Sequence, residues 1–183
     1  MKRSQLAHLL ALSYLLGERA DLLVVGSQAI LGSVPEAKLP PEAVRSMEAD
    51  ITFLDNDEEK ADRVDAILGE DSKFHHDFGY YAQGVGVTTA SLPEGWRGRV
   101  VQFPANLVNG AIAYCPELHD LLAAKLVPLR EKDIAYAAAL VRAGLVDLDV
   151  LEDRVGKLPR SVHPDITARI RDLISDWRNA PRT

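Results

Sequence analysis

Apolar residues recur along the first half of the chain with two periods, a helical period of three to four residues and a strand period of two. Glycines follow two of the helical stretches and predict where those helices end. The patterns therefore predict alternating helices and strands with short connections. The predicted elements are a helix over 6–16, a strand over 21–25, a helix start at 28–31, a strand over 47–53 and a helix over 58–68.

The second half of the chain predicts two more strands and then only helices. The strands cover 80–90 and 99–103, and a turn at 92–95 joins them. The predicted helices cover 116–128, 131–143, 147–155 and 164–177. This order predicts an α/β or α+β fold with a C-terminal helical part. We divide it into an α/β core over 1–115 and a helical part over 116–183, forming one compact unit or a core with a tail.

Composition narrows the class of protein. Of the 183 residues, 47% are hydrophobic, which is enough to bury one good core. The single cysteine, Cys115, cannot form an intrachain disulfide and is interpreted as an inert core thiol. No apolar run is long enough to span a bilayer, so we expect a cytoplasmic protein with no membrane partner.

The negative charge is concentrated in one segment. The formal net charge is -6, and residues 48–77 alone carry eleven acidic and three basic side chains. A general polyanion-binding protein needs a basic surface, so the charge excludes that class. If the substrate carries phosphates, bound cations and a few chosen Lys or Arg side chains must meet them locally.

Two short motifs predict a phosphate site beside a metal site. Gly26 and Ser27 follow the first predicted strand where a helix begins, and such a turn presents free N–H groups and a positive dipole end to an anion. Glu48 and Asp50 alternate with apolar residues on the second strand, so both carboxylates leave the same face. Adjacent carboxylates repel unless they share a cation. Mg²⁺ suits them, because it typically takes one or two carboxylates together with substrate phosphates.

Lys125 falls inside the apolar stripe of its predicted helix, seven residues after Leu118. Such a lysine either rests its stem on apolar surface with the ammonium in water, or contacts an anion such as a substrate phosphate. Arg130 lies just beyond and could supply a second phosphate contact through its planar guanidinium. Asp133 could orient one of these basic groups, although mixed charge is also usual on a solvated helix start.

Other polar clusters have structural explanations. His75, His76 and Asp77 predict a polar loop, because adjacent histidines on an extended segment point opposite ways and no third ligand has suitable spacing. Asp120 lies in the first turn of its predicted helix, where an acidic side chain complements the helix dipole.

The order of the motifs resembles the signature of the DNA polymerase β superfamily of nucleotidyltransferases. The resembling features are Val-Gly-Ser at 25–27 after a strand, and alternating apolar and acidic residues at 47–51. The segments 119–126 and 130–133 are similar to the helical part of minimal bacterial members, which include the AbiEii and MenT toxins and their uncharacterised relatives. The resemblance covers roughly residues 20–140.

The resemblance implies a mixed sheet flanked by helices and the transfer of a nucleoside monophosphate from a nucleoside triphosphate to an acceptor hydroxyl. It implies that Gly26 and Ser27 hold the triphosphate and that Glu48 and Asp50 carry Mg²⁺. Lys125 and Arg130 would stabilise charge on the phosphates, with Asp133 beside them. The acceptor would be RNA such as tRNA, or a protein. The chain would then be the toxin of a toxin–antitoxin pair, with an antitoxin as partner.

One departure from the superfamily pattern concerns a third carboxylate, which active members commonly carry on a neighbouring strand. Residues 85–89 and 100–102 contain none. Asp77, Asp120 or Asp133 could substitute, or one metal ion could suffice. The alternative is a catalytically degenerate member that has the same fold and binds a nucleotide or a protein partner without turnover.

Overall fold

The first predicted strand forms the centre of a mixed sheet. The computed structural model describes residues 1–104, 107 and 110–180. The strands are β1 Leu22–Val25, β2 Glu48–Phe53, β3 Tyr81–Gly84, β4 Val101–Gln102 and β5 Ala113–Cys115. They lie in the order β3-β2-β1-β5-β4. β1 is antiparallel to β2 and parallel to β5, while β2 is parallel to β3 and β4 is antiparallel to β5.

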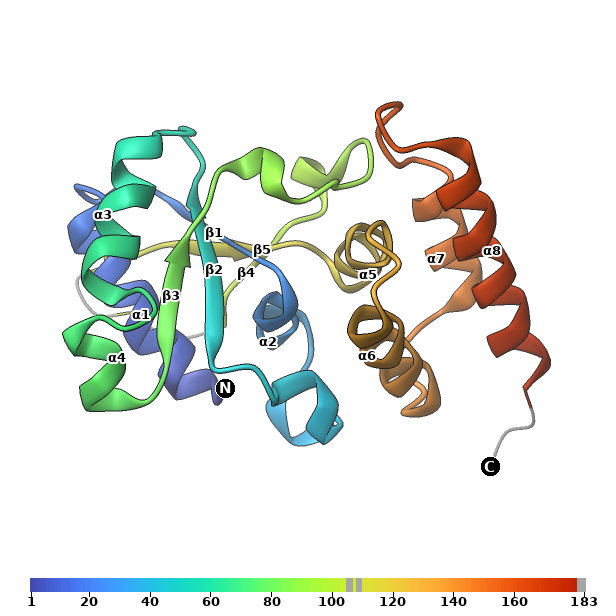
Figure 1. Ribbon diagram of the computed structural model, residues 1–183, viewed down its shortest axis with the longest axis horizontal. Helices are drawn as coiled ribbons and strands as arrows, with labels where there is room; N and C mark the ends of the chain where they lie inside the picture. Colours follow the sequence, from blue (N-terminus) through green and yellow to red (C-terminus); the bar gives the residue numbers. More distant parts are fainter. Residues whose placement is uncertain (105–106, 108–109, 181–183) are drawn as a thin grey trace.

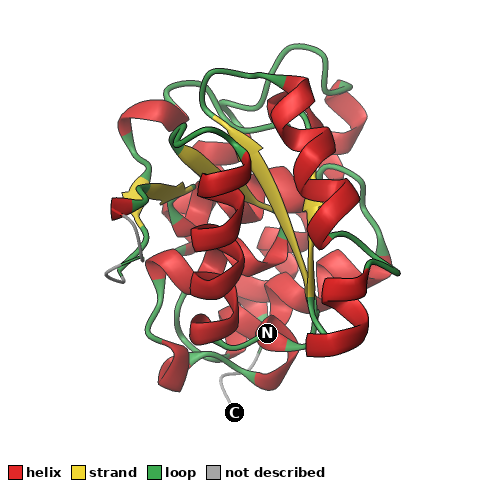
Figure 2. Ribbon diagram, turned by 90° about the vertical axis from the view of Figure 1, so that its left-hand side faces the viewer, coloured by secondary structure: helices red, strands yellow, loops and turns green. Residues whose placement is uncertain are grey.

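Helices flank this sheet, and the last four form a separate group in Figure 1. The α-helices are α1 Arg3–Leu16, α2 Ile30–Ser33, α3 Glu58–Leu68, α4 Lys73–Phe78, α5 Leu118–Leu126, α6 Glu131–Arg142, α7 Leu148–Val155 and α8 Pro164–Asn179. α1, α3 and α4 lie on the side of β2 and β3, seen face-on in Figure 2, while α8 packs on α7 and α7 on α5. The predicted fold class, a mixed sheet with a C-terminal helical part, is confirmed.

The core follows the hydrophobic pattern of the sequence. β1 is buried along its whole length, as expected for a central strand covered on both faces. On β2, Ala49, Ile51 and Phe53 are fully buried, whereas Glu48 and Asp50 stay partly exposed. One hydrophobic cluster joins these strands to the leucines of α1 and α5. The predicted division of the chain after residue 115 stays a prediction.

Local capping explains why the helices begin and end where they do. The Asp57 side chain accepts hydrogen bonds from the backbone N–H groups of Glu59 and Lys60, so α3 has the predicted bounds.

Cys115 is fully buried, and burial raises the pKa of its thiol to about 12, which agrees with an inert thiol. None of the helices in the described ranges is long and apolar enough to cross a membrane.

Two expectations were wrong in detail, and one strand was not predicted. The strand predicted at 80–90 ends at Gly84, where a Cβ atom would lie 1.8 Å from the Ala61 carbonyl oxygen, and a 3₁₀ turn follows at Val87–Thr89. The histidine pair lies on helix α4, because Ser72 caps its first turn and Gly79 ends it with a left-handed conformation. Strand β5 was missed because three residues are too short to give a pattern.

A buried ion cluster ties the C-terminal helices to the loop before β4. Asp120 on α5 is fully buried and accepts two hydrogen bonds from Arg99, at 2.8 and 2.9 Å. Arg154 on α7 brings its Nε within 3.2 Å of the same carboxylate. Arg99 also donates to the Glu94 carbonyl at 2.9 Å. Asp120 is therefore a structural anchor rather than a simple complement to the helix dipole.

We expect Asp120→Ala to lower the free energy of unfolding by about 3 kcal/mol, because it leaves Arg99 and Arg154 without their buried carboxylate. Urea denaturation followed by circular dichroism measures the change. Asp77→Ala is the matched control, because its half-exposed carboxylate pairs with Lys73, which is 87% exposed, and we expect a loss below about 1 kcal/mol. Equal losses in the two variants would contradict the anchoring role.

Candidate active site

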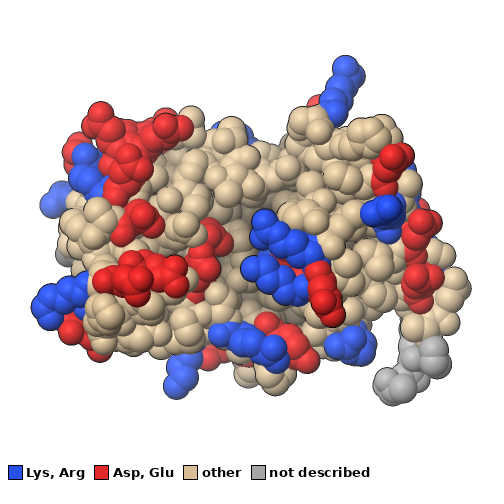
Figure 3. Space-filling model, in the orientation of Figure 1, with Lys and Arg blue, Asp and Glu red and all other residues tan. Residues whose placement is uncertain are grey.

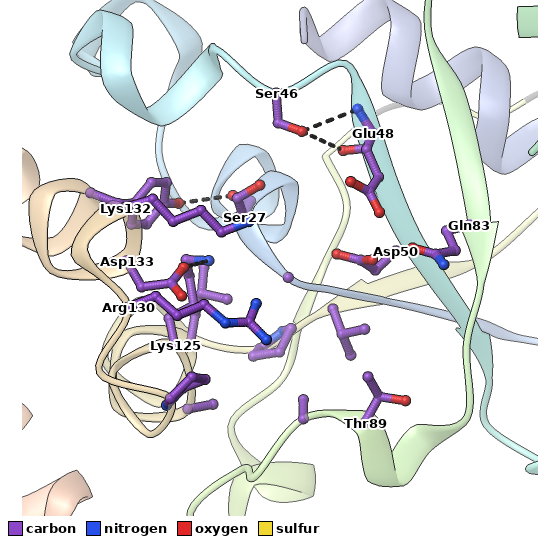
Figure 4. Close-up of a pocket in the computed structure, with 18 of the residues that line it drawn as sticks. Ser27, Ser46, Glu48, Asp50, Gln83, Thr89, Lys125, Arg130, Lys132 and Asp133 are labelled. Carbon is purple, nitrogen blue, oxygen red and sulfur yellow. Dashed lines mark hydrogen bonds and ion pairs between the residues drawn. The ribbon is translucent and has the colours of Figure 1, made fainter. Parts of the chain in front are cut away.

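The two sequence motifs meet because β1 and β2 are antiparallel. Val25 at the end of β1 pairs with Asp50 near the start of β2, so the Gly26-Ser27 turn lies over the acidic strand. A cavity of about 580 Å³ opens there between the sheet and helices α5 and α6 (Figure 4). Its polar lining residues include Ser27, Ser46, Glu48, Asp50, Gln83, Thr89, Lys125, Arg130, Lys132 and Asp133.

Gly26 is required by both conformation and space. Its φ of +68° lies in a region that side chains rarely adopt, and an added Cβ atom would lie 1.8 Å from Asp50 Oδ2. Behind it, a 3₁₀ turn at Ser27–Ala29 leads into the four-residue helix α2, where the sequence predicted a helix start. So short a helix has a small dipole. Anion binding here would therefore depend on the N–H groups of the turn and on neighbouring cations.

Glu48 and Asp50 form the acidic wall of the cavity. Burial raises the pKa of Asp50 to about 6, with a further contribution from the neighbouring Glu48 carboxylate. β3 places two residues beside these carboxylates, because Tyr81 pairs with Glu48 and Gln83 pairs with Asp50, and Gln83 also lines the cavity. Burial, with Glu48 beside it, raises the pKa of Tyr81 to about 12, so its hydroxyl stays protonated.

The two carboxylates fit a hard cation that takes its remaining ligands from a substrate. Both line the cavity, and the raised pKa of Asp50 indicates negative charge that its protein neighbours do not fully compensate. Within residues 1–104, 107 and 110–180, no group of three or more His, Cys, Asp or Glu side chains is arranged to hold a metal. Glu48 and Asp50 would thus suit Mg²⁺ together with phosphate oxygens, but not a metal held by protein ligands alone.

The opposite wall of the cavity is basic. Lys125 Nζ lies 2.7 Å from Asp133 Oδ1 and 5.1 Å from the centre of the Tyr136 ring, with 15% of its side chain exposed. Its ammonium is therefore held at the cavity rather than extended into water. Arg130 and Lys132 are exposed and line the same wall, and Arg130 points into the cavity in Figure 4. Figure 3 shows Lys and Arg side chains facing acidic ones across a hollow in the surface.

Tyr136 joins the basic wall to the Gly26-Ser27 turn. Its hydroxyl donates a hydrogen bond of 2.8 Å to the Ser27 carbonyl, across 109 residues of sequence. Its ring is the one that packs against the Lys125 ammonium. Tyr136 is 6% exposed, so both contacts are shielded from water. One side chain on α6 thereby fixes the relative positions of the turn and the lysine.

The structure brings together every residue that the sequence assigned to the site. Gly26, Ser27, Glu48, Asp50, Lys125, Arg130 and Asp133 all line the one cavity. Of the possible replacements for a third carboxylate, Asp77 pairs with Lys73 on α4 and Asp120 lies in the buried ion cluster, while Asp133 lines the cavity but pairs with Lys125.

Sequence reasoning did not assign several other polar side chains that line the cavity. These are Glu42, Arg45, Ser46, Gln83, Thr89, Lys132 and Tyr136. Lys132 lies within the charged segment that the sequence singled out and could have been included. Gln83 and Tyr136 carried no signal, because their places depend on the register of β3 and on how α6 packs against the turn.

Comparison with known proteins gives one match. A family model described as "Nucleotidyltransferase of unknown function (DUF6036)" matches residues 4–182, nearly the whole chain. No curated protein and no solved structure matches the chain.

We expect Asp50→Asn to stabilise the metal-free protein at neutral pH and to have little effect near pH 4. The folded-state pKa of about 6 exceeds the ordinary aspartate value of 3.8, so ionised Asp50 opposes folding by up to about 3 kcal/mol above pH 6. This penalty fades as the pH falls from 6 towards 4, because the carboxyl is then protonated in the folded state. Urea denaturation at pH 7.5 and pH 4, both with a chelator, measures the difference.

Asp62→Asn on the exposed face of α3 is the matched control and should leave the free energy of unfolding unchanged at both pH values. If Asp50→Asn stabilised the protein equally at pH 4 and pH 7.5, its effect would come from packing and not from charge.

Proposed function

The chain belongs to the family described as nucleotidyltransferase of unknown function (DUF6036), and from that membership we propose that its cavity carries out magnesium-dependent nucleotidyl transfer. In this reaction an acceptor hydroxyl attacks the α-phosphorus of a nucleoside triphosphate, and pyrophosphate and a proton leave. The observation that carries the proposal is the convergence of Gly26-Ser27, Glu48 with Asp50, and Lys125 with Asp133 on one cavity.

Each wall has a separate task in this proposal. The N–H groups of the Gly26-Ser27 turn and the cations of the basic wall bind the phosphates, and the turn stays in position through Tyr136. Glu48 and Asp50 would hold Mg²⁺, which supplies charge neutralisation and alignment of the reacting oxygens when it is bound. Asp133 orients the Lys125 ammonium towards the phosphates, because its Oδ1 lies 2.7 Å from Lys125 Nζ.

Arg130 and Lys132 are the natural contacts for the leaving pyrophosphate. Both are exposed at the cavity, and the pairing of Lys125 with Asp133 leaves that lysine with less net charge to offer. A guanidinium and an ammonium on one wall neutralise the charge that builds up as the phosphate bond breaks.

A second candidate function is nucleotide binding without transfer. The observation that favours it is Gln83, which lies opposite Asp50 on β3, the neighbouring strand on which a third carboxylate would complete the acidic set. An amide adds no negative charge for a second metal ion and does not accept a proton from an acceptor hydroxyl at neutral pH. In this second function, the same cavity would bind a nucleotide as a ligand without transferring any part of it.

The finer proposal for the acceptor follows the likeness of segments 119–126 and 130–133 to AbiEii and MenT toxins. We propose a bacterial toxin that transfers a nucleotide to tRNA or to a protein, and that a cognate antitoxin restrains. The charge pattern is compatible with this, because the basic side chains at the cavity offer a local contact for RNA although the whole chain is acidic.

The test of transfer uses each α-³²P-labelled nucleoside triphosphate with Mg²⁺ and either total tRNA or cell lysate. We expect label on one acceptor class, and a loss of about 100-fold or more in Glu48→Gln combined with Asp50→Asn and in Lys125→Met. Lys73→Met is the matched control, because Lys73 is 87% exposed on α4, away from the cavity. Thermal unfolding verifies that each variant is folded.

Transfer that persists in the double carboxylate variant would exclude the proposed site. Magnesium-dependent nucleotide binding with no labelled acceptor would establish the second candidate in place of transfer.

Induced expression in a bacterial host tests the toxin proposal. We expect growth arrest with the wild-type chain and normal growth with the double carboxylate variant at equal protein level, because the arrest would require transfer. Equal arrest by both forms would exclude nucleotidyl transfer as the cause.

A further inference from the structure

The cavity has two ends of opposite character. The end at Gly26, Glu48 and Asp50 is polar and charged, as described above. The other end lies between the loop at 89–92 and the first turns of α5. Its lining residues are Thr89, Ala90, Leu92, Pro116, Leu121 and Ala124, which we call the apolar end. Thr89 supplies its one polar side chain among the residues that the structure describes.

Helix α5 links the two ends at a fixed spacing. Leu121, Ala124 and Lys125 line the cavity from one face of this helix, since residues three and four apart are neighbours on a helix surface. Leu121 lies about one helical turn, roughly 5.4 Å, from Lys125, and Ala124 lies beside the lysine, so the apolar end extends from the lysine over about one turn. That offset is comparable to the step from the phosphates of a nucleotide to its sugar and base. A nucleotide with its phosphates on the charged end would extend its nucleoside along this face.

The apolar end is preformed. The loop that carries Leu92 is fixed to α5 through the bidentate contact of Arg99 with Asp120. The same loop is fixed to the end of α7, because the Glu94 N–H donates a 2.7 Å hydrogen bond to the Lys157 carbonyl. Leu92 is 6% exposed and Leu121 is 2% exposed, so these walls are packed from behind. A ligand there meets a surface of fixed shape.

We propose that the apolar end is the nucleoside subsite and that it takes purine and pyrimidine triphosphates alike. This inference rests on the proposed function, because it assigns the rest of the same substrate. An apolar surface contacts the face of any base and cannot read the hydrogen-bonding edge that distinguishes one base from another. A single threonine hydroxyl can both donate and accept, so it also does not select one edge.

Equilibrium binding with inorganic tripolyphosphate and four non-hydrolysable nucleoside triphosphate analogues, all in Mg²⁺, separates the two ends. For the wild type we expect the four analogues to bind within about tenfold of one another. Ala124→Leu fills the apolar end, and we expect each analogue to bind about tenfold or more weakly. Tripolyphosphate should change by less than about twofold, because it occupies only the charged end.

Two further variants keep the test decisive. Ala90→Leu fills the same end from the loop and should repeat the selective loss if Ala124→Leu does not fold. Ala143→Leu is the matched control, because Ala143 is exposed at the end of α6, outside the cavity, and it should bind all five ligands as the wild type does.

The outcomes distinguish this inference from the function on which it rests. If the wild type bound neither tripolyphosphate nor any analogue, the proposed function would be overturned together with the subsite. If all ligands bound but the filling variants weakened tripolyphosphate and analogues equally, or weakened neither, the nucleoside subsite alone would be wrong. A preference of about 100-fold for one base would overturn the lack of base selection.

Discussion

The candidate site depends on the contact between a glycine and a carboxylate. Gly26 passes so close to Asp50 that any side chain at this position would collide with the carboxylate, and its φ of +68° is one that glycine adopts without strain. The antiparallel register of Val25 with Asp50 forces this approach, because the end of β1 then lies beside the start of β2. The turn proposed to bind phosphate and the strand proposed to bind Mg²⁺ are thereby held in contact, which is the arrangement that a metal-bound phosphate would require.

The basic wall of the cavity depends on an uncharged side chain. Tyr136 holds the Ser27 carbonyl through its hydroxyl and the Lys125 ammonium through its ring, while Asp133 fixes that ammonium from the side. These contacts connect α5 and α6 to a turn about a hundred residues earlier. Helices α5 and α6 are therefore part of the candidate site, and the buried Asp120 cluster extends the same rigidity to the loop on the far side of the cavity.

Local patterns predicted most of the elements but only part of the site. The alternation over β2 and the capping of α3 are local signals, and both were predicted with nearly correct bounds. Lys125 was conspicuous because it interrupts an apolar stripe. Gln83 and Tyr136 were not, because strand register and helix packing bring them to the cavity, and neither leaves a mark on the neighbouring sequence. The length of strand β3 was overestimated, because close packing of Gly84 against α3 ends the strand early.

The charges of the two walls also bear on why the acidic and basic side chains stay apart across the cavity. Lys125 lowers the pKa of Asp50 more than Lys132 does, yet burial and Glu48 outweigh both cations and the pKa of Asp50 remains about 6. A direct ion pair between Lys125 and Asp50 would relieve that repulsion and stabilise the fold, but it would close the space between the walls. Pairing Lys125 with Asp133 instead keeps the cavity open and leaves the acidic wall in need of a cation. The fold thus carries a local electrostatic penalty that binding of a metal and a phosphate chain would remove.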